Sequence, residues 1–453
     1  MTTDMTKGSP AKLLWKFAIP MLISVIFQQL YNIADSIIAG NFINKEALAA
    51  VGASFPITMI FISIGTGANV GCTVIISQYF GAKQYAEMKT AIFTSIFSVL
   101  GLGAILTVIG SFMTTPLLRL LETPDNILSD AELYLNVYVW GLTFLFLYNI
   151  CTGIFTALGN SITPLIFLIV SSVSNVILDY VFVVYFEMGV SGVAWATFIC
   201  QGVCAVVALI VLFIRLSKIK AENKHKLFSG TMLKTVSTIA IPSILQQSFV
   251  SVGNIFVQGI VNGFGDNAVA GFAAAVKLNV FAISCVSTVC NSISSFAAQN
   301  AGAGDIKRIK QGFKNGLLIV AIVTAPFMIL FLMFPSRLIG IFMDSEAADN
   351  LEAIAIGAQF IKIVVPFYVA VAIKLSADAI LRGTASMREF MIATFADLIL
   401  RVIFAYILSP HFGVTGVWMS WPIGWVIASA MSLAYYVMGH WKKIVEDGVM
   451  QKQ

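Results

Sequence analysis

The sequence predicts an all-α polytopic membrane protein with twelve transmembrane helices in two pseudo-symmetric six-helix bundles. Three observations lead to this fold class: the composition, a series of apolar runs of membrane-spanning length, and an internal repeat. Of the 453 residues, 58% are hydrophobic and 11% are charged, and the mean hydropathy is +0.91. This composition excludes a soluble globular protein and favours an integral membrane protein.

The apolar runs are each long enough to cross a bilayer, which takes about 20 apolar residues. We expect all of them to be helices, because hydrocarbon offers no hydrogen-bond partners to an open backbone. The runs lie near residues 13–41, 48–80, 90–114, 132–157, 162–186, 190–214, 235–263, 268–298, 312–334, 353–381, 388–410 and 413–439. We therefore expect an N-terminal six-helix lobe at 1–214, a basic cytoplasmic linker at 215–234 and a C-terminal six-helix lobe at 235–453.

The two halves of the chain repeat each other's motifs at nearly constant offsets. The recurring motifs are Ala18-Ile19-Pro20 with Ala240-Ile241-Pro242, Asn32 with Asn254, Gln78 and Gly81 with Gln299 and Gly302, Gly159 with Gly383, and the segment 189–193 with 413–417. Because six spans is an even number, both halves enter the membrane from the same side and are related by an axis along the membrane normal. A cavity between two such bundles is typical of a transporter.

The distribution of Lys and Arg indicates the orientation, because cytoplasmic loops carry an excess of both. Twenty of these residues lie at the termini and in the connections on the side of the termini. The opposite connections carry Lys45, Arg119 and Arg337. We expect a multi-pass protein of the cell membrane with both termini in the cytoplasm.

Two acids lie within the apolar runs of the first half. Asp35 is near the end of the first run, and Asp179 lies one helical turn after Asn175, with Thr197 on the next run. A carboxylate at such a depth is costly unless it faces a wet cavity, a partner or a bound cation. These oxygens suit Na⁺, which takes hard oxygen ligands, or H⁺, which a buried carboxylate otherwise takes up. Each residue also has a structural explanation when taken alone, and these alternatives stay open. Asp35 could lie at the membrane interface, Asn175 could form a helix–helix hydrogen bond, and Thr197 could serve packing alone.

The second half differs in charge from the first. Val257 and Ile403 stand at the repeat-equivalent positions of the two acids, so we expect the cation site to occur once. Lys277 and Lys362 have no obvious local partner in the sequence. Two placements stay open for these lysines, at a membrane interface by snorkelling or in the cavity of the second half.

Two charged pairs also lie within the second half. Lys374 with Asp378, and Asp397 with Arg401, are spaced four residues apart, the spacing of an ion pair on a helix. We expect self-neutralising structural pairs, and we keep Lys374 and Asp378 as candidates for the substrate cavity as well.

The other chemistry-bearing residues favour packing over catalysis. All six Cys lie within apolar runs and are expected to be small core residues. The glycine-rich segment 65–71 lies within a run, where close helix approach is a better explanation than nucleotide binding. The chain has no Walker A sequence, and its three His lie in loops or at the ends of runs. We expect no enzyme, no cofactor other than a coupling ion and no nucleic-acid partner.

On these residues the chain resembles the MATE (multidrug and toxic compound extrusion) transporters over essentially its whole length. The resemblance rests on the two parallel six-span halves, Pro20 followed by the stretch 28–35 (QQLYNIAD), the Gln78 loop with its repeat, and the segment 189–197. In the family, a first-helix acid corresponds to Asp35. In one branch, an acid with an Asn on one helix and a Thr on the next complete a cation site in the amino-terminal lobe.

The resemblance therefore implies a Na⁺ or H⁺ site at Asp35, Asn175, Asp179 and Thr197. A second branch uses acids of the seventh, eighth and tenth helices. This chain departs from that pattern, because its seventh span has no acid and its eighth carries Lys277. The candidates for the substrate cavity are Gln28, Asn32, Lys277, Lys374 and Asp378.

Together these observations predict a secondary active antiporter that exports organic, cationic and amphipathic compounds in exchange for Na⁺ or H⁺. We expect a monomer whose partners are small-molecule substrates and membrane lipids. The alternative is a flippase for a lipid-linked saccharide, because lysines of the second half allow a cationic cavity for pyrophosphate.

Overall fold

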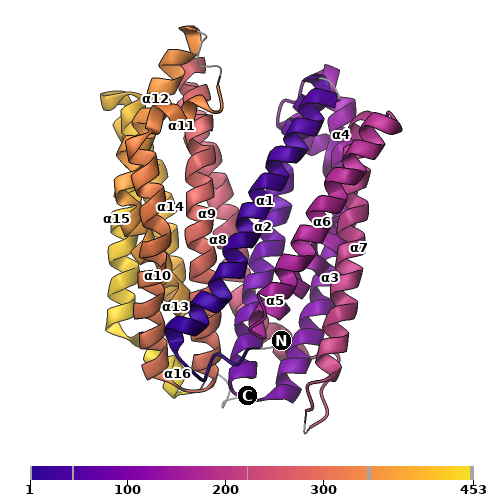
Figure 1. The fold of residues 1–453 in the computed structure, drawn as a ribbon, viewed down its shortest axis with the longest axis vertical. Helices are drawn as coiled ribbons and strands as arrows, with labels where there is room; N and C mark the ends of the chain where they lie inside the picture. The colour runs from indigo at the N-terminus through magenta and orange to yellow at the C-terminus, as the bar shows by residue number, and fades with distance from the viewer. Residues whose placement is uncertain (1–2, 43–44, 222, 344–347, 449–453) are drawn as a thin grey trace. The chain divides into compact units, whose positions relative to one another are not determined.

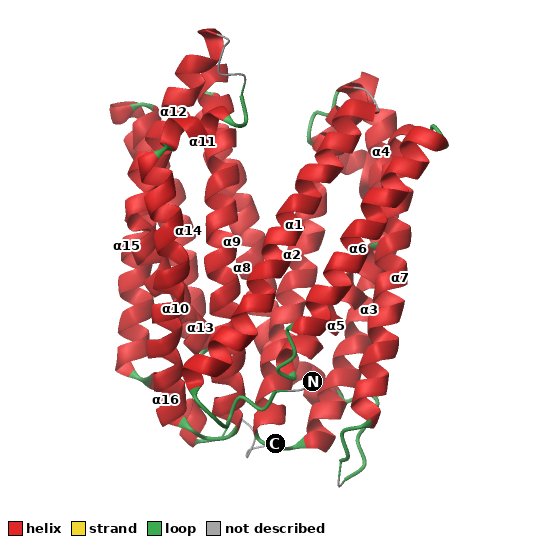
Figure 2. Ribbon diagram, in the orientation of Figure 1, coloured by secondary structure: helices red, strands yellow, loops and turns green. Residues whose placement is uncertain are grey.

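The computed structural model describes residues 3–42, 45–221, 223–343 and 348–448, with the side chains of 32–48 and 344–349 left out. Within these ranges the chain forms helices joined by short loops and turns, and no strand (Figure 2). The predicted all-α fold class is confirmed.

The helices of the first half are coloured from indigo to magenta in Figure 1. They are α1 (Pro10–Phe42), α2 (Lys45–Gly81), α3 (Tyr85–Leu120), α4 (Asp125–Trp140), α5 (Leu142–Ala157), α6 (Ile162–Tyr180), the π-helix η1 (Val181–Tyr185) and α7 (Gly189–Ser217). Those of the second half are α8 (Gly230–Asn262), α9 (Asp266–Gly302), α10 (Ile306–Met333), α11 (Pro335–Gly340), α12 (Ala348–Val364), the 3₁₀-helix η2 (Val365–Phe367), α13 (Tyr368–Gly383), α14 (Met387–Phe412), α15 (Val414–Met438) and α16 (His440–Glu446).

Membrane-spanning length is reached by 11 helices in the described part of the chain, or by up to 12 if one bent pair counts as a single span. That pair is α4 with α5, which meet at an angle of 47°. Their junction is Gly141, and together they cover the run predicted near 132–157. The twelve predicted runs therefore correspond to twelve spans, with α12, η2 and α13 forming one of them.

Packing divides the chain into two compact units. Unit 1 contains residues 3–4 and Ile19–Gln247, and unit 2 contains Met5–Ala18 and Ser248–Gln453. The first helix of each half is thus shared: α1 changes unit after Ala18, and α8 changes unit after Gln247. The boundaries expected from the sequence, at 1–214, 215–234 and 235–453, stay a prediction.

The interior of unit 2 is built around stacked and edge-to-face aromatic rings. The indole of Trp418 stacks on Phe272 at a centroid distance of 5.0 Å and meets Phe360 edge-on at 5.1 Å. Trp421 meets Trp425 at a right angle, 5.7 Å away. Aromatic pairs in these geometries add to the hydrophobic gain of burial, so they fix how α9, α12 and α15 pack.

In unit 1, glycines of α2 allow the start of α8 to approach closely. A Cβ atom at Gly67 would lie 2.4 Å from the Cα of Ile244, and one at Gly71 would lie 2.4 Å from the Cα of Ala240. Such distances exclude any side chain at either position. The prediction of close helix packing for segment 65–71 is confirmed.

We expect Gly71→Ala to destabilise the protein by about 1–3 kcal/mol, because the added methyl group overlaps backbone that cannot move independently. The measurement is the melting temperature of the purified protein in detergent. Gly52→Ala in the same helix is the matched control, because a Cβ there meets nothing within 4 Å. Equal melting temperatures for the two variants would show that α2 and α8 do not pack in this way.

Candidate functional site

Helix α6 presents polar residues to the interior of unit 1. Its buried residues are Ser172, Asn175 and Asp179. The apolar side chains more than half exposed on this helix are Ile162, Ile166, Val170, Val173 and Ile177. This pattern reverses that of a helix in a water-soluble protein, so the polar face of α6 is where a function is expected.

Asp179 stands at the point where α6 changes its helical geometry. The residue is fully buried, and the π-helix η1 begins two residues later at Val181. Single π-turns inside helices occur often at functional sites. The following helix α7 packs close to this turn, because a Cβ at Gly192 would lie 3.1 Å from the Cβ of Phe182.

The side-chain amide of Asn175 joins three elements. Oriented to match its neighbours, its nitrogen donates to Asp179 Oδ2 at 3.1 Å and to the Tyr31 hydroxyl at 2.6 Å. Its oxygen accepts the backbone N–H of Thr197 at 3.2 Å. Asn175 therefore links α6 to α1 and to α7, all within unit 1. We call Tyr31, Asn175, Asp179 and Thr197 the α6 cluster.

The structure brings together three of the four residues predicted for the cation site, namely Asn175, Asp179 and Thr197. Thr197 takes part through its backbone N–H, whereas the sequence argument used its hydroxyl. The side chains of Asp35 and Asn32 lie outside the described residues. The backbone of α1 is helical through this stretch, so position 35 lies one turn after Tyr31 on the same helix face.

Tyr31 is a member of the cluster that the sequence argument did not single out. It lies inside the QQLYNIAD stretch on which the family resemblance rests, and this stretch is the only feature of the sequence that could have indicated a role for Tyr31. The thiol of Cys200 also interacts with Asn175 and Asp179. Like the other five cysteines, Cys200 is free and buried, so the expectation of small core residues is confirmed.

A small cavity lies on the other side of Thr197, between α4 and α7. Its volume is about 10 Å³, roughly the room that one water molecule needs. The lining residues are Tyr134, Val137, Tyr138, Gly141, Ala194, Thr197, Phe198 and Gln201. Thr197 is therefore shared between this cavity and the α6 cluster.

The candidates for the substrate cavity have different surroundings. Gln28 is exposed on α1, and Lys277 and Lys362 are exposed on α9 and α12. The Lys277 ammonium lies 5.6 Å from the ring centre of Phe342.

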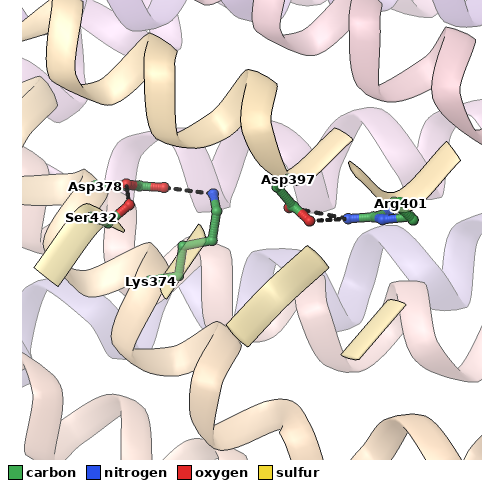
Figure 3. Close-up of polar contacts among 5 residues, drawn as sticks. All are labelled: Lys374, Asp378, Asp397, Arg401 and Ser432. Carbon is green, nitrogen blue, oxygen red and sulfur yellow. Dashed lines mark hydrogen bonds and ion pairs between the residues drawn. The ribbon is translucent and has the colours of Figure 1, made fainter. Parts of the chain in front are cut away.

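The charged pairs of unit 2 are buried ion pairs (Figure 3). Lys374 Nζ lies 2.8 Å from Asp378 Oδ2, whose other oxygen accepts from the Ser432 hydroxyl at 2.6 Å. Arg401 donates to both carboxylate oxygens of Asp397, at 3.1 and 3.2 Å. Both predicted i,i+4 pairs are confirmed.

The pairs on α13 and α14 are held by their neighbours as well as by each other. The guanidinium of Arg401 lies 4.4 Å from the ring centre of Trp421. A Cβ at Gly424 would lie 2.8 Å from Asp397 Oδ1, so this glycine of α15 makes room for the carboxylate. A groove of about 400 Å³ between η2, α13 and α15 is lined by Ile373 and Ser429, but not by Lys374 or Asp378.

Comparison with known proteins places the chain among transporters. A family model described as MatE matches residues 20–181 and 242–407, so the same model fits the two halves in turn. The chain is 27% identical over 448 residues to the probable multidrug resistance protein YpnP of Bacillus subtilis, covering 97% of each chain. It is 24% identical over 434 residues to the multidrug export protein MepA of Staphylococcus saprophyticus, covering 95% of each.

Solved structures show the same fold. A MOP superfamily transporter from Pyrococcus furiosus superimposes with a TM-score of 0.90 at 23% identity, covering 98% of this chain and 99% of that one. The outward-facing conformation of a MATE family transporter gives the same TM-score, identity and coverage. The likeness shows that this chain shares the fold of those transporters.

We expect Lys374→Met to destabilise the protein by about 3–5 kcal/mol, because it strands a buried carboxylate. The double variant Lys374→Met with Asp378→Leu should recover most of this loss, and melting temperatures of the two single variants and the double variant measure the coupling. The pair His440–Glu389 is the control, because His440 is 63% exposed and Glu389→Gln should cost less than about 1 kcal/mol. Additive effects at Lys374 and Asp378 would contradict a structural ion pair.

Proposed function

Because the chain belongs to the MATE family of membrane transporters and is not an enzyme, we propose that it is a secondary active multidrug efflux antiporter. It exports organic, cationic and amphipathic compounds in exchange for Na⁺ or H⁺. The curated relatives, whose names refer to multidrug resistance and export, support the direction and breadth of transport. The observation that carries the proposal is the fully buried Asp179 with neutral polar neighbours in the α6 cluster.

The coupling ion binds at Asp179 and Asp35 in this proposal. A Na⁺ ion beside Asp179 requires the amide of Asn175 to turn end for end, because a cation is coordinated by the oxygen and not by the nitrogen. That turn breaks the bond to the backbone N–H of Thr197 and reverses the direction of the bond with Tyr31, whose hydroxyl can donate as well as accept. A proton on Asp179 requires no such turn, but it weakens the hydrogen bond that the charged carboxylate accepts.

Na⁺ therefore changes the contacts that join α6 to α1 and α7, and a proton changes the bond of Asp179 to the amide that makes those contacts. An ion shifts a conformational equilibrium by the difference in its affinity for the two states, and these contacts supply such a difference. Substrate and ion are coupled when each favours the opposite state. The excess of Lys and Arg on the side of the termini supports a cytoplasmic location for both ends.

The lipid-linked saccharide flippase is not favoured. That alternative used lysines of the second half to hold a pyrophosphate group, and one of them, Lys374, is buried and paired with Asp378. The names of the relatives point to drug export as well.

We expect Asp179→Asn and Asp35→Asn each to reduce ion-driven efflux at least tenfold, which corresponds to about 1.4 kcal/mol or more of lost ion binding. The measurement is ethidium efflux from proteoliposomes under a Na⁺ gradient and a proton gradient imposed separately. The gradient that drives the wild type identifies the ion. Asp125→Asn, on the exposed first turn of α4, is the control and should behave as wild type. Full efflux by Asp179→Asn would remove this residue from the coupling site.

We expect Tyr31→Phe to keep the fold and lower ion-driven efflux about threefold to tenfold, because Asn175 loses a hydrogen-bond acceptor worth about 1 kcal/mol. The half-saturating concentration of the driving ion should change with it. Tyr406→Phe is the control, since Tyr406 is 74% exposed on α14. An unchanged rate and ion dependence in Tyr31→Phe would separate α1 from the α6 cluster.

A further inference from the structure

The segment before α1 is bound by three side chains of unit 2. The N–H of Met5 donates to Gln299 Oε1 at 2.9 Å. The carbonyl oxygen of Met5 accepts from Arg308 NH2 at 2.9 Å and from Asn300 Nδ2 at 3.3 Å, and that of Gly8 accepts from Arg308 NH1 at 2.8 Å. We call Gln299, Asn300 and Arg308 the N-terminal socket.

The hydrogen bonds of the socket all go to the main chain of the segment. The guanidinium of Arg308 is planar and rigid, and its NH1 and NH2 groups donate to the carbonyl oxygens of Gly8 and Met5. Its third nitrogen, Nε, donates to Asn300 Oδ1 at 2.9 Å, which fixes the orientation of the guanidinium. The ring of Phe296 lies under this guanidinium at 5.6 Å. Gln299 and Asn300 are fully buried, and Met5 is 1% exposed. The socket is therefore buried around Met5, while the bond of Arg308 to Gly8 lies at the surface.

The geometry of the segment sets where α1 begins. Gly8 has a φ of +86°, a conformation that side chains disfavour, and it turns the chain toward Ser9 and Pro10. Pro10 is the first helical residue, a position that suits its fixed φ and missing N–H. From Met5 to Ala18 the chain packs with unit 2, whereas α1 beyond Ala18 packs with unit 1 and carries Tyr31.

The start of the second half is held in a comparable way by different residues. Ahead of α8, the N–H of Lys226 donates to Thr90 Oγ1 at 3.1 Å, and that of Ser229 donates to Thr94 Oγ1 at 3.2 Å. At the offset of 221 that relates Gln299 to Gln78, Glu87 corresponds to Arg308. The guanidinium socket therefore belongs to the second half alone, while main-chain anchoring occurs ahead of both helices.

We propose that the N-terminal socket is a permanent anchor, which holds the start of α1 on unit 2 through the whole transport cycle. Release would leave the buried amides of Gln299 and Asn300 without these partners, which is costly away from water. Any bending of α1 during transport is then confined to the part beyond Ala18, where Pro20 already removes a helical hydrogen bond. The proposal depends on neither the identity of the coupling ion nor that of the substrate.

The test is hydrogen exchange of the Met5 amide, the N–H that donates to Gln299, measured by mass spectrometry of the full-length protein. The quantity compared is the protection factor, which is the intrinsic exchange rate at each pH divided by the measured rate. In the wild type we expect it to change less than twofold on adding ethidium, adding Na⁺ or lowering the pH. A protection factor that falls tenfold or more in any of these conditions would show that the segment leaves the socket, and would overturn the proposal.

Two variants test the residues of the socket. Arg308→Gln should accelerate exchange of the Met5 amide at least tenfold and lower ethidium efflux, whereas Lys307→Gln, exposed on the same turn of α10, should change neither. If Arg308→Gln does not fold, Gly8→Ala offers a second route, because its strained φ should loosen the segment while the socket stays intact. Unchanged exchange in the variant that folds would contradict the proposal.

Discussion

The structure depends on one constraint: a polar group in hydrocarbon must find its partner within the protein. Helix α6 meets it by turning its polar face inward, with Asp179 bonded to a neutral amide. Unit 2 meets it with ion pairs, of which Lys374 with Asp378 is one. The two solutions differ in consequence. In unit 2 a charged side chain four residues away neutralises each carboxylate, whereas the amide that donates to Asp179 is neutral.

The features that the sequence predicted are those encoded by local spacing. Spans follow from the length of apolar runs, and the ion pair of Asp397 with Arg401 follows from a spacing of four residues on one helix. Close packing at Gly67 and Gly71 follows from residue size alone. The two members of the ion pair are near each other in the chain, and the need for a small residue at Gly67 and Gly71 does not depend on which helix packs against them.

The features that sequence reasoning missed depend on how helices rotate and meet. Tyr31 and Asn175 are far apart in the chain, and the socket side chains are about 300 residues from Met5. The repeat offset pairs Asp179 with Ile403, yet Ile403 is 44% exposed while Asp179 is fully buried. A linear offset identifies corresponding helices but not the face each turns inward, and the π-turn after Asp179 changes that face locally. The absence of an acid at Ile403 therefore says little about α14.

Helix α1 connects the two sets of interactions. Its start is held in unit 2 through Met5, and Tyr31, farther along, is bonded in unit 1 to the amide that also touches Asp179. A helix fixed at one end transmits a change at the other only if it is stiff or bends at a defined point. Pro20, two residues after α1 changes unit, supplies such a point because no backbone N–H is available there. In the proposed cycle, ion binding at Asp179 acts through Asn175 and Tyr31 on α1, whose start is held in unit 2. Because α1 can bend only beyond its anchored start, a local change in charge produces a bend near Pro20.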